Sequence, residues 1–195
     1  MSKIIFLNGC GSAGKTSIAK SIQHLSNELW LTFGIDSFID MIPFAKQEPY
    51  LKFLPGKNEH GPTMRVETGP EASKLFGLMP KFAEMLASEG NNLIIDEVLL
   101  DNKNLINYAH QLSEHDIYYI GVFCDLNIMR EREILRGDRA LGLSADQITR
   151  VHKDISGNYD LEVDTTNSSP FELAKTILEY VKNNPAPKIF KDIIK

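Results

Sequence analysis

Three glycines stand close together near the start of the chain, within the segment FLNGCGSAGKTSIAK at residues 6–20. The spacing of Gly9, Gly14, Lys15 and Thr16 matches the pattern G-x-x-x-x-G-K-[ST]. Glycine permits positive φ angles, so consecutive backbone N–H groups can turn inward and surround an anion at the start of a helix. We therefore expect a nucleotide-binding loop; the alternative is a glycine-rich turn that holds no ligand. The predicted nucleotide contacts are Gly9, Cys10, Gly11, Ser12, Ala13, Gly14, Lys15, Thr16 and Ser17.

Such a loop binds magnesium together with an acid from a neighbouring strand. Lys15 is expected to reach the β- and γ-phosphates of ATP, and the Thr16 hydroxyl to bind Mg²⁺. The segment NLIIDE at residues 92–97 supplies Asp96 after an apolar run. An ionised carboxylate there can hold a magnesium-bound water, so Thr16 and Asp96 are the predicted metal ligands. The alternative for Asp96 is a cap on the next element, and Glu97 is left open between magnesium or substrate contact and simple solvation.

A carboxylate that could accept a proton lies in TFGIDSFIDMIP at residues 32–43. Asp36 is expected to terminate a strand, on the sheet edge that also carries the phosphate loop. From there it could take the proton of an acceptor hydroxyl. The alternative is that Asp36 caps a helix that runs through Phe38 and Ile39. Asp40, one helical turn further on, is the second candidate.

Several arginines gather in REREILRGDRALGLS at residues 130–144. A guanidinium presents a fixed fork of donors to phosphate oxygens, and nearby glycines let such a segment hinge as a lid that excludes water. We expect Arg132 and Arg136 to contact the nucleotide, and Arg136 and Arg139 to act at the transferred phosphoryl group. The alternative, strongest for Arg130, is a solvated helix in which acidic side chains neutralise the arginines. The glycines are Gly137 and Gly142, and the acidic residues are Glu131, Glu133 and Asp138.

The segment DLEVDTTNSSP at residues 160–170 follows the pattern of a last strand and its loop. Loops in this place often contact the nucleotide, which makes Asp164, Thr165 and Thr166 candidates, with a structural turn as the alternative. The histidines, including His152 near Asp154, show no partner at catalytic-triad spacing, and we interpret them as surface or core residues.

These residues must be positioned by alternating strands and helices, because apolar runs alternate with helical periodicity throughout. That alternation predicts an α/β fold with a parallel sheet covered by helices on both faces. Residues 45–69, with three prolines and little periodicity, are expected to form a long loop. The predicted strands are 3–7, 30–36, 92–96, 117–124 and 161–166, and the predicted helices are 15–29, 70–88, 101–113, 126–136, 144–155 and 170–182.

Size and composition limit the class of protein. The chain has 195 residues, which suits a single domain over residues 1–183, and a tail over residues 184–195 that docks or frays. The net charge of −5 argues against a nucleic-acid partner. No apolar stretch approaches 18 residues and no signal peptide is evident, so we expect a cytoplasmic protein without a membrane partner. The two cysteines, Cys10 and Cys124, form no disulfide framework.

The length and the motifs favour a kinase over other nucleotide-binding proteins. A Ras-type GTPase needs the guanine-reading motif N-K-x-D, but Leu105 follows Asn102-Lys103-Asn104 where the aspartate should be. Motor ATPases are usually longer. A small-molecule or nucleotide kinase, which positions an acceptor in line with the γ-phosphate, is the natural interpretation.

Five segments together resemble the chloramphenicol phosphotransferase family of P-loop kinases, over roughly residues 3–181. They are LNGCGSAGKTS, FGIDSFIDMIP, LIIDEVLL, VFCD with REREILRGDRALG, and YDLEVDTT. The resemblance implies ATP-dependent phosphorylation of the drug's primary hydroxyl, and hence antibiotic resistance. It implies a catalytic base at Asp36, lid arginines at Arg136 and Arg139, and the loop lysine and hydroxyl at Lys15 and Thr16. The match fades over residues 45–69.

We therefore expect a P-loop NTPase of the nucleoside-monophosphate-kinase type, a three-layer sandwich with five parallel strands in the order 2-3-1-4-5. An arginine lid would span roughly residues 130–146 and an acceptor-side insertion roughly residues 40–80. The expected reaction moves the γ-phosphate of ATP, with Mg²⁺, to a hydroxyl of a small molecule such as chloramphenicol. One alternative is another small-molecule or nucleotide kinase of this fold, whose charged acceptor would be met by Lys52 and Arg65. The other is a nucleotide-binding regulator without phosphotransfer, and a homo-oligomer also stays open.

Overall fold

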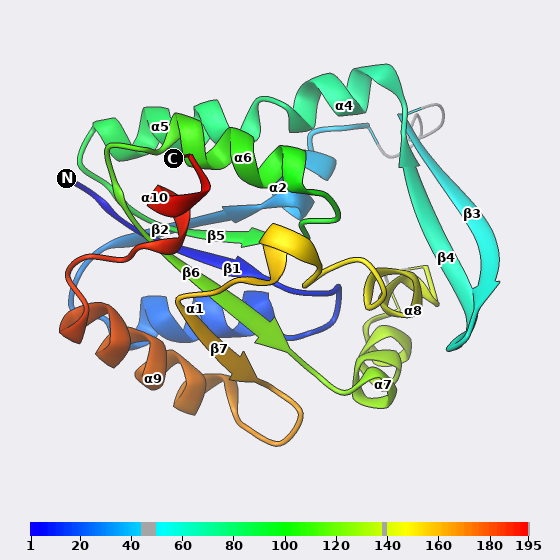
Figure 1. Ribbon diagram of the computed structural model, residues 1–195. Helices are drawn as coiled ribbons and strands as arrows, with labels where there is room; N and C mark the ends of the chain where they lie inside the picture. Colours follow the sequence, from blue (N-terminus) through cyan, green and yellow to red (C-terminus); the bar gives the residue numbers. More distant parts are fainter. Residues whose placement is uncertain (44–49, 138–139, 195) are drawn as a thin grey trace.

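A five-stranded parallel sheet forms the centre of the molecule (Figure 1). The computed structural model describes residues 1–43, 50–137 and 140–194. The strand order β2-β5-β1-β6-β7 is the predicted order 2-3-1-4-5 counted over the sheet's own strands, so the predicted topology is confirmed. The strands are β1 (Lys3–Asn8), β2 (Trp30–Gly34), β5 (Asn92–Glu97), β6 (Asp116–Phe123) and β7 (Leu161–Asp164).

The central strand β1 is apolar along nearly its whole length because it is covered on both faces. Phe6 lies between Ile95 of β5 and Tyr119 of β6. In the same register Leu7 lies opposite Asp96. The carboxyl ends of β1 and β5 therefore meet at one edge, and the predicted phosphate loop starts next to the predicted metal ligand.

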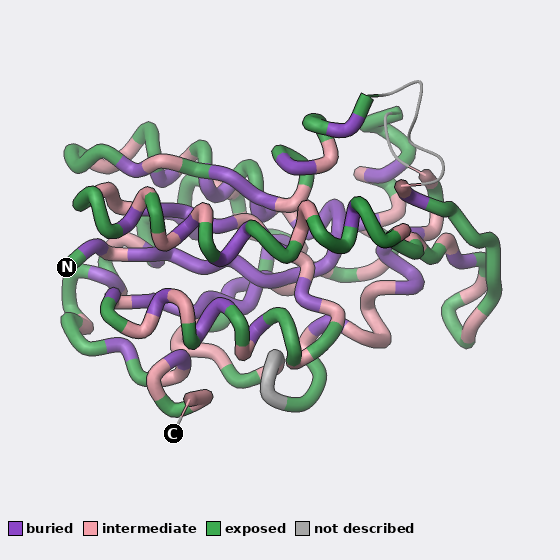
Figure 2. Tube along the Cα trace, turned by 90° about the horizontal axis from the view of Figure 1, so that it is seen from above, coloured by how far each residue is buried: buried purple, intermediate pink, exposed green. Residues whose placement is uncertain are grey.

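Two helical layers cover the sheet, as the parallel topology requires. Figure 1 shows α1 and α9 on one side and α5 and α6 on the other. Figure 2, seen from above, shows that the buried residues follow the strands and the inward sides of the helices. These helices are α1 (Lys15–Leu25), α9 (Pro170–Asn183), α5 (Met79–Ser88) and α6 (Asn102–Gln111).

The prediction of a long loop over residues 45–69 is wrong for the part that the structure describes. Residues 51–68 form an antiparallel hairpin of β3 (Leu51–Asn58) and β4 (Gly61–Thr68), which stands away from the sheet (Figure 1). The prolines made these strands hard to recognise in the sequence. Pro55 lies opposite Met64, and the N–H of Met64 donates to the carbonyl of Gly142 and not to β3, so no hydrogen bond between the two strands is needed at this pair. Proline is tolerated where no ladder bond is needed.

Two predicted helices are shorter than expected. The helix expected over 144–155 is only α8 (Leu143–Gln147), and positive φ angles of 65° at His152 and 52° at Asp154 accompany a turn and a 3₁₀ segment, η2 (Asp154–Gly157). The helix expected over 70–88 is divided into α4 (Pro70–Phe76) and α5. The remaining helices are α2 (Ile35–Ile39), α7 (Leu126–Arg136) and α10 (Ile189–Ile193).

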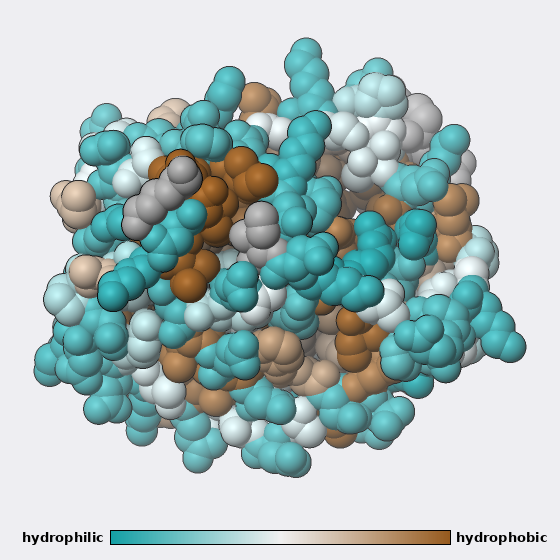
Figure 3. Space-filling model, viewed as in Figure 1, coloured by the Kyte–Doolittle hydropathy of each residue, from teal (hydrophilic) through white to brown (hydrophobic). Residues whose placement is uncertain are grey.

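The C-terminal segment packs on the domain. Phe190 of α10 is 2% exposed, and its ring centroid lies 5.3 Å from that of Phe6 and 5.1 Å from that of Tyr119. Polar side chains cover most of the face seen in Figure 3. Within the described ranges no helix has the length and apolar character needed to cross a membrane. Both cysteines are free thiols, as expected.

Candidate active site

The phosphate loop joins β1 to α1 in a backbone conformation that selects its residue types. Gly14 has φ 91° and Ser12 has φ 63°, both left-handed. A Cβ at Gly9 would lie 2.4 Å from the carbonyl oxygen of Val122, so only glycine fits against β6. The loop therefore passes close to the sheet and turns into α1, where Gly14 accepts the first helical N–H, from Ile18.

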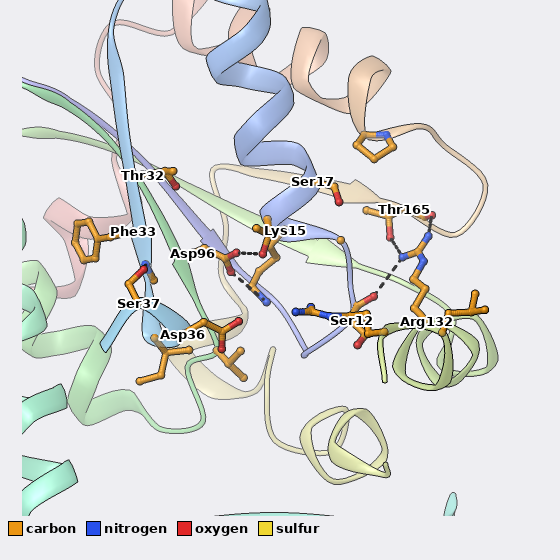
Figure 4. A pocket seen from close by; sticks show the side chains of 18 residues that line it. Ser12, Lys15, Ser17, Thr32, Phe33, Asp36, Ser37, Asp96, Arg132 and Thr165 are labelled. Carbon is orange, nitrogen blue, oxygen red and sulfur yellow. Dashed lines mark hydrogen bonds and ion pairs between the residues drawn. The ribbon is translucent and has the colours of Figure 1, made fainter. Parts of the chain in front are cut away.

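Lys15 and Asp96 lie close together at the edge of the sheet (Figure 4), and Thr16 contacts the same carboxylate. The buried Lys15 Nζ donates to the carbonyl oxygens of Gly9 and Cys10, at 3.0 Å each, and lies 3.4 Å from Asp96 Oδ1. Thr16 Oγ1 donates to Asp96 Oδ2 at 2.6 Å. The structure thus brings together three residues that the sequence analysis assigned to phosphate and metal.

The donor set at this point fits magnesium. A hydroxyl and a carboxylate are hard oxygen ligands, and Mg²⁺ typically takes only one or two from the protein and completes its shell with water and phosphate oxygens. Over residues 1–43, 50–137 and 140–194 no group of three or more His, Cys, Asp or Glu residues could hold a metal ion. Thr16 and Asp96 would therefore hold a magnesium ion only in company with a phosphate ligand.

A cavity of about 510 Å³ opens beside the loop. Its walls come from five segments: the phosphate loop with the start of α1, the junction of β2 and α2, the end of β5, helix α7, and the turn between β7 and α9 (Figure 4). Lining residues that the sequence analysis missed are Thr32, Phe33, Gly34, Ile35, Ser37, Val98, Leu135 and Pro170. None of these side chains is charged. Five of them lie in the segments FGIDSFIDMIP and LIIDEVLL, but no sequence signal assigned them to the site: Phe33, Gly34, Ile35, Ser37 and Val98.

Asp36 lines this cavity, but from a different element than expected. Strand β2 ends at Gly34, and Asp36 is in the first turn of α2. A Cβ at Gly34 would lie 2.2 Å from the carbonyl oxygen of Asp96, so β2 and β5 pack too closely there for any other residue. Gly34 is also the N-cap of α2, and its N–H donates to Ser37 Oγ at 3.3 Å, so the capping alternative for Asp36 is wrong. Asp40 is the C-cap of α2 and does not line the cavity.

Arg132 connects α7 to the phosphate loop and to the turn after β7. Its Nη1 donates to Thr165 Oγ1 at 2.9 Å and to the Ser12 carbonyl at 3.4 Å, and its Nη2 donates to the Thr165 carbonyl at 2.9 Å. None of the described carboxylates forms an ion pair with it, so the solvated, ion-paired alternative is wrong for this residue. Arg132 therefore presents a positive charge at the cavity wall.

The other arginines of α7 differ in position. Arg136, in the last turn of α7, lines the cavity. Arg130 donates instead to the carbonyl of His60 in the turn of the hairpin. Glu133 is 2% exposed and accepts the N–H groups of Gly142 and Ser144, so it does not neutralise the arginines. Arg139 lies outside the described residues.

The turn after β7 contains one residue that faces the site and two that stabilise the turn. Thr165 is 2% exposed, lines the cavity and donates to the Ala13 carbonyl at 2.8 Å. Asp164 accepts the N–H of Thr166 at 2.7 Å, and Thr166 Oγ1 accepts the N–H of Asp125 at 2.8 Å. The structural-turn alternative thus describes the contacts of Asp164 and Thr166.

Burial raises the pKa of two groups, one in the loop and one at the end of the neighbouring strand β5. Burial raises the pKa of the Cys10 thiol to about 11. Burial also raises the pKa of Glu97 to about 7, although its carboxylate accepts the Tyr108 hydroxyl at 2.9 Å and the Val98 N–H at 3.2 Å, contacts that favour the charged form. The alternative of simple solvation is therefore wrong for Glu97, which is 6% exposed and is not among the residues that line the cavity.

A buried polar network supports the start of the loop. Asn8 donates to the hydroxyl of Tyr159 at 2.8 Å, and that hydroxyl lies 2.5 Å from His152 Nδ1. The ring of His152 stacks on Phe123 with centroids 4.1 Å apart. Burial lowers the pKa of His152 to about 4, which favours a neutral imidazole, and the side chain is partly buried, between the surface and core positions expected for it.

Comparison with known proteins places this geometry among kinases. Two Mycobacterium tuberculosis proteins, from strains CDC 1551 and H37Rv and each named "Putative O-phosphotransferase", are 30% identical over 200 residues, covering 99% of this chain and 88% of theirs. The Deinococcus radiodurans tunicamycin resistance protein superposes with a TM-score of 0.63 at 17% identity, covering 93% of this chain and 96% of that one.

Two solved kinases share the fold. The M. tuberculosis APS kinase in complex with AMPPNP and APS has a TM-score of 0.62 at 12% identity, covering 93% of this chain and 98% of its own. The Acinetobacter baumannii shikimate kinase in complex with shikimate has a TM-score of 0.59 at 14% identity, with 94% and 95% covered. The fold is therefore that of P-loop kinases. The family described as chloramphenicol phosphotransferase-like protein matches residues 2–182, and the chain belongs to that family.

Proposed function

We propose that this protein transfers the γ-phosphoryl group of ATP, with Mg²⁺, to a hydroxyl group of a small molecule. The observation that carries the proposal is that one cavity is lined both by Lys15, Thr16 and Asp96 and by Asp36. Bound magnesium would supply charge neutralisation at the phosphates. A nucleotide with its acceptor is the ligand pair that uses both sides of such a cavity.

The residues of the chain would divide the reaction between them. Asp36 takes the proton of the acceptor hydroxyl while the hydroxyl oxygen forms a bond to the γ-phosphorus. The bond from that phosphorus to the β,γ-bridging oxygen breaks, and ADP leaves with the electron pair. Lys15 and Arg136 stabilise the charge that develops on the phosphoryl oxygens, and they do so from a partly closed cavity in which such contacts are strong.

The acceptor side of the cavity favours an alcohol without an anionic group. The lining residues from β2 and α2 contribute a single charge, that of Asp36. Lys52 and Arg65, which would suit a charged acceptor, are not among the lining residues, and Arg65 Nε instead pairs with Asp146 at 3.3 Å. A neutral alcohol such as chloramphenicol therefore fits better than a phosphorylated or carboxylate acceptor. Phosphorylating such a drug would give resistance, in the cytoplasm where ATP is available.

A direct assay tests this proposal. The protein is incubated with Mg·ATP and a panel of neutral, cationic and anionic alcohols that includes chloramphenicol and shikimate, and products are followed by phosphorus NMR. We expect a new phosphate ester with a neutral alcohol. With the best acceptor, Asp36→Asn should lower kcat about 10²- to 10⁴-fold, since it removes the base.

Asp40→Asn is the matched control, because Asp40 lies on the same helix but outside the cavity, and it should retain the wild-type rate. ATP binding with no ester formed from any alcohol would contradict the proposal and favour a nucleotide-binding regulator. Full activity in Asp36→Asn would remove this residue from the mechanism.

A further inference from the structure

Helix α8 lies between the phosphate loop and the hairpin and contacts both. At its last residue, Gln147 Oε1 accepts the N–H of Gly11 in the phosphate loop at 2.6 Å. In its middle, the Ala145 carbonyl accepts the side-chain amide of Asn58 at 2.7 Å. At its start, Gly142 accepts the N–H of Met64 from the edge of β4 at 3.0 Å. Figure 1 shows α8 between α7 and the hairpin.

The start of α8 is held by the buried carboxylate of Glu133 from α7. The carboxylate of Glu133 accepts the N–H of Gly142 at 3.0 Å and that of Ser144 at 2.6 Å. Gly142 has φ 94°, and a Cβ there would lie 3.1 Å from Met64 N, so the junction between α8 and β4 is tight. An unpaired buried carboxylate is costly, which makes these two bonds hard to give up.

Salt bridges secure the hairpin to the same short helix. Asp146 is 8% exposed, and its two oxygens pair with Arg65 of β4 at 3.3 Å and with Arg150 at 2.9 Å. The helix is therefore fastened to α7, to the hairpin and to the phosphate loop, and movement of one of these requires a change in the others.

We infer that Gln147 is a positioning residue for phosphate binding, and that α8 couples the hairpin to the phosphate loop through it. The inference rests on the proposed nucleotide site. The amide oxygen of Gln147 orients Gly11 directly before Ser12, the residue whose φ is 63°. A cradle of N–H groups binds phosphate well only when its peptides are oriented in advance. A neutral amide does this without adding a negative charge beside the phosphates.

Binding of Mg·ADP and of adenosine, measured by calorimetry, tests the role of Gln147. Gln147→Met keeps the length of the side chain but removes the acceptor. The loss of one hydrogen bond should weaken Mg·ADP binding about 3- to 10-fold. Adenosine, which has no phosphate, should bind as it does to the wild type. Equal weakening of both ligands, or no weakening of either, would overturn the inference.

A double-variant comparison tests the coupling to the hairpin. Asn58→Ala, which removes the contact to Ala145, should weaken Mg·ADP binding, and the variant carrying both changes should bind no more weakly than Gln147→Met alone. Lys57→Ala is the matched control: Lys57 is exposed and precedes Asn58 on β3. Effects that multiply, or an equal effect of Lys57→Ala, would contradict the coupling.

Each variant's fold is checked by its circular dichroism spectrum and melting temperature. Should Gln147→Met fail to fold, the test rests on Asn58→Ala: weaker Mg·ADP binding in this variant would support the coupling, and unchanged binding would overturn it. A wild-type protein that binds no Mg·ADP would refute the proposed nucleotide site itself. Wild-type binding with no effect of Gln147→Met would refute only the role of this residue.

Discussion

Thr16 and Asp96 are 80 residues apart in the chain, yet the hydroxyl of one donates to the carboxylate of the other at 2.6 Å. The contact joins the start of α1 to the end of β5. Both residues follow from local rules, since one ends a glycine loop and the other a buried strand. Their meeting requires β1 and β5 to be neighbours in the sheet, and the register that pairs Leu7 with Asp96 provides this.

Asp96→Asn should remove most phosphotransfer while leaving the fold intact. The substitution keeps an acceptor for Thr16 but removes the charge that a magnesium shell needs. We expect a higher Mg²⁺ concentration at half-maximal rate, measured by titrating MgCl₂ at fixed ATP. Asp101→Asn is a suitable control, because Asp101 is the N-cap of α6 and does not line the cavity, and asparagine also caps. An unchanged Mg²⁺ dependence in Asp96→Asn would exclude it as a ligand.

Lys15→Ala should lose the γ-phosphate contact. Oriented charge contacts of this kind are worth on the order of 2–4 kcal/mol in a transition state, so kcat should fall by about 10²- to 10³-fold. The fold should survive, since within the described ranges the polar contacts of the Lys15 ammonium are with two carbonyls of its own loop and with Asp96. Steady-state kinetics and a thermal melt measure the two effects. Wild-type turnover in a folded Lys15→Ala variant would refute the phosphate-loop interpretation.

Arg136→Ala should lower kcat more than it raises the KM for ATP, because the charge that this side chain meets develops during transfer. Arg139→Ala is predicted from the sequence to behave in the same way. Arg130→Ala is the comparison on the same helix, since Arg130 contacts the hairpin turn and not the cavity. Variants that raised only the KM for ATP would instead make these arginines holders of the bound nucleotide.

Glu97 predicts a pH-dependent term in stability. Its pKa is about 7 in the folded protein against 4.5 in the unfolded chain, so the folded state holds the proton more tightly. This contribution is complete below pH 4.5 and is lost as the pH rises through 7. It amounts to at most about 3 kcal/mol. Urea unfolding at pH 4.5 and pH 8 should show a larger loss of free energy of unfolding in the wild type than in Glu97→Gln. An equal loss of free energy of unfolding in both proteins would contradict a raised pKa for Glu97.

The strands and the phosphate loop could be predicted because both depend on local signals, whereas the order of the strands followed from the expected kinase fold type. Apolar runs mark the strands, and the loop needs glycine where a side chain would strike a neighbouring strand, as at Gly9. The hairpin could not be predicted, because proline is rare within strands and Pro55 occupies a position where no hydrogen bond to the other strand is needed. The capping role of Gly34 was missed because it depends on the close approach of β5.

Gln147 could not be found from sequence at all. Its partner is a backbone N–H located 136 residues earlier, and no side-chain pattern announces such a contact. The lining residues Val98 and Pro170 likewise come to one cavity only in the folded chain. Spacing within one segment predicts chemistry, whereas contacts between a side chain and distant backbone emerge only from the tertiary structure.

The docking of α10 has a consequence for synthesis. Phe190 packs on Phe6 and Tyr119, so one aromatic cluster combines residues from early and late parts of the chain. During translation, Phe6 and Tyr119 leave the ribosome well before Phe190 exists. The part of this face that α10 covers therefore stays apolar and exposed until α10 has been made, and in that interval chaperones and aggregation compete for it.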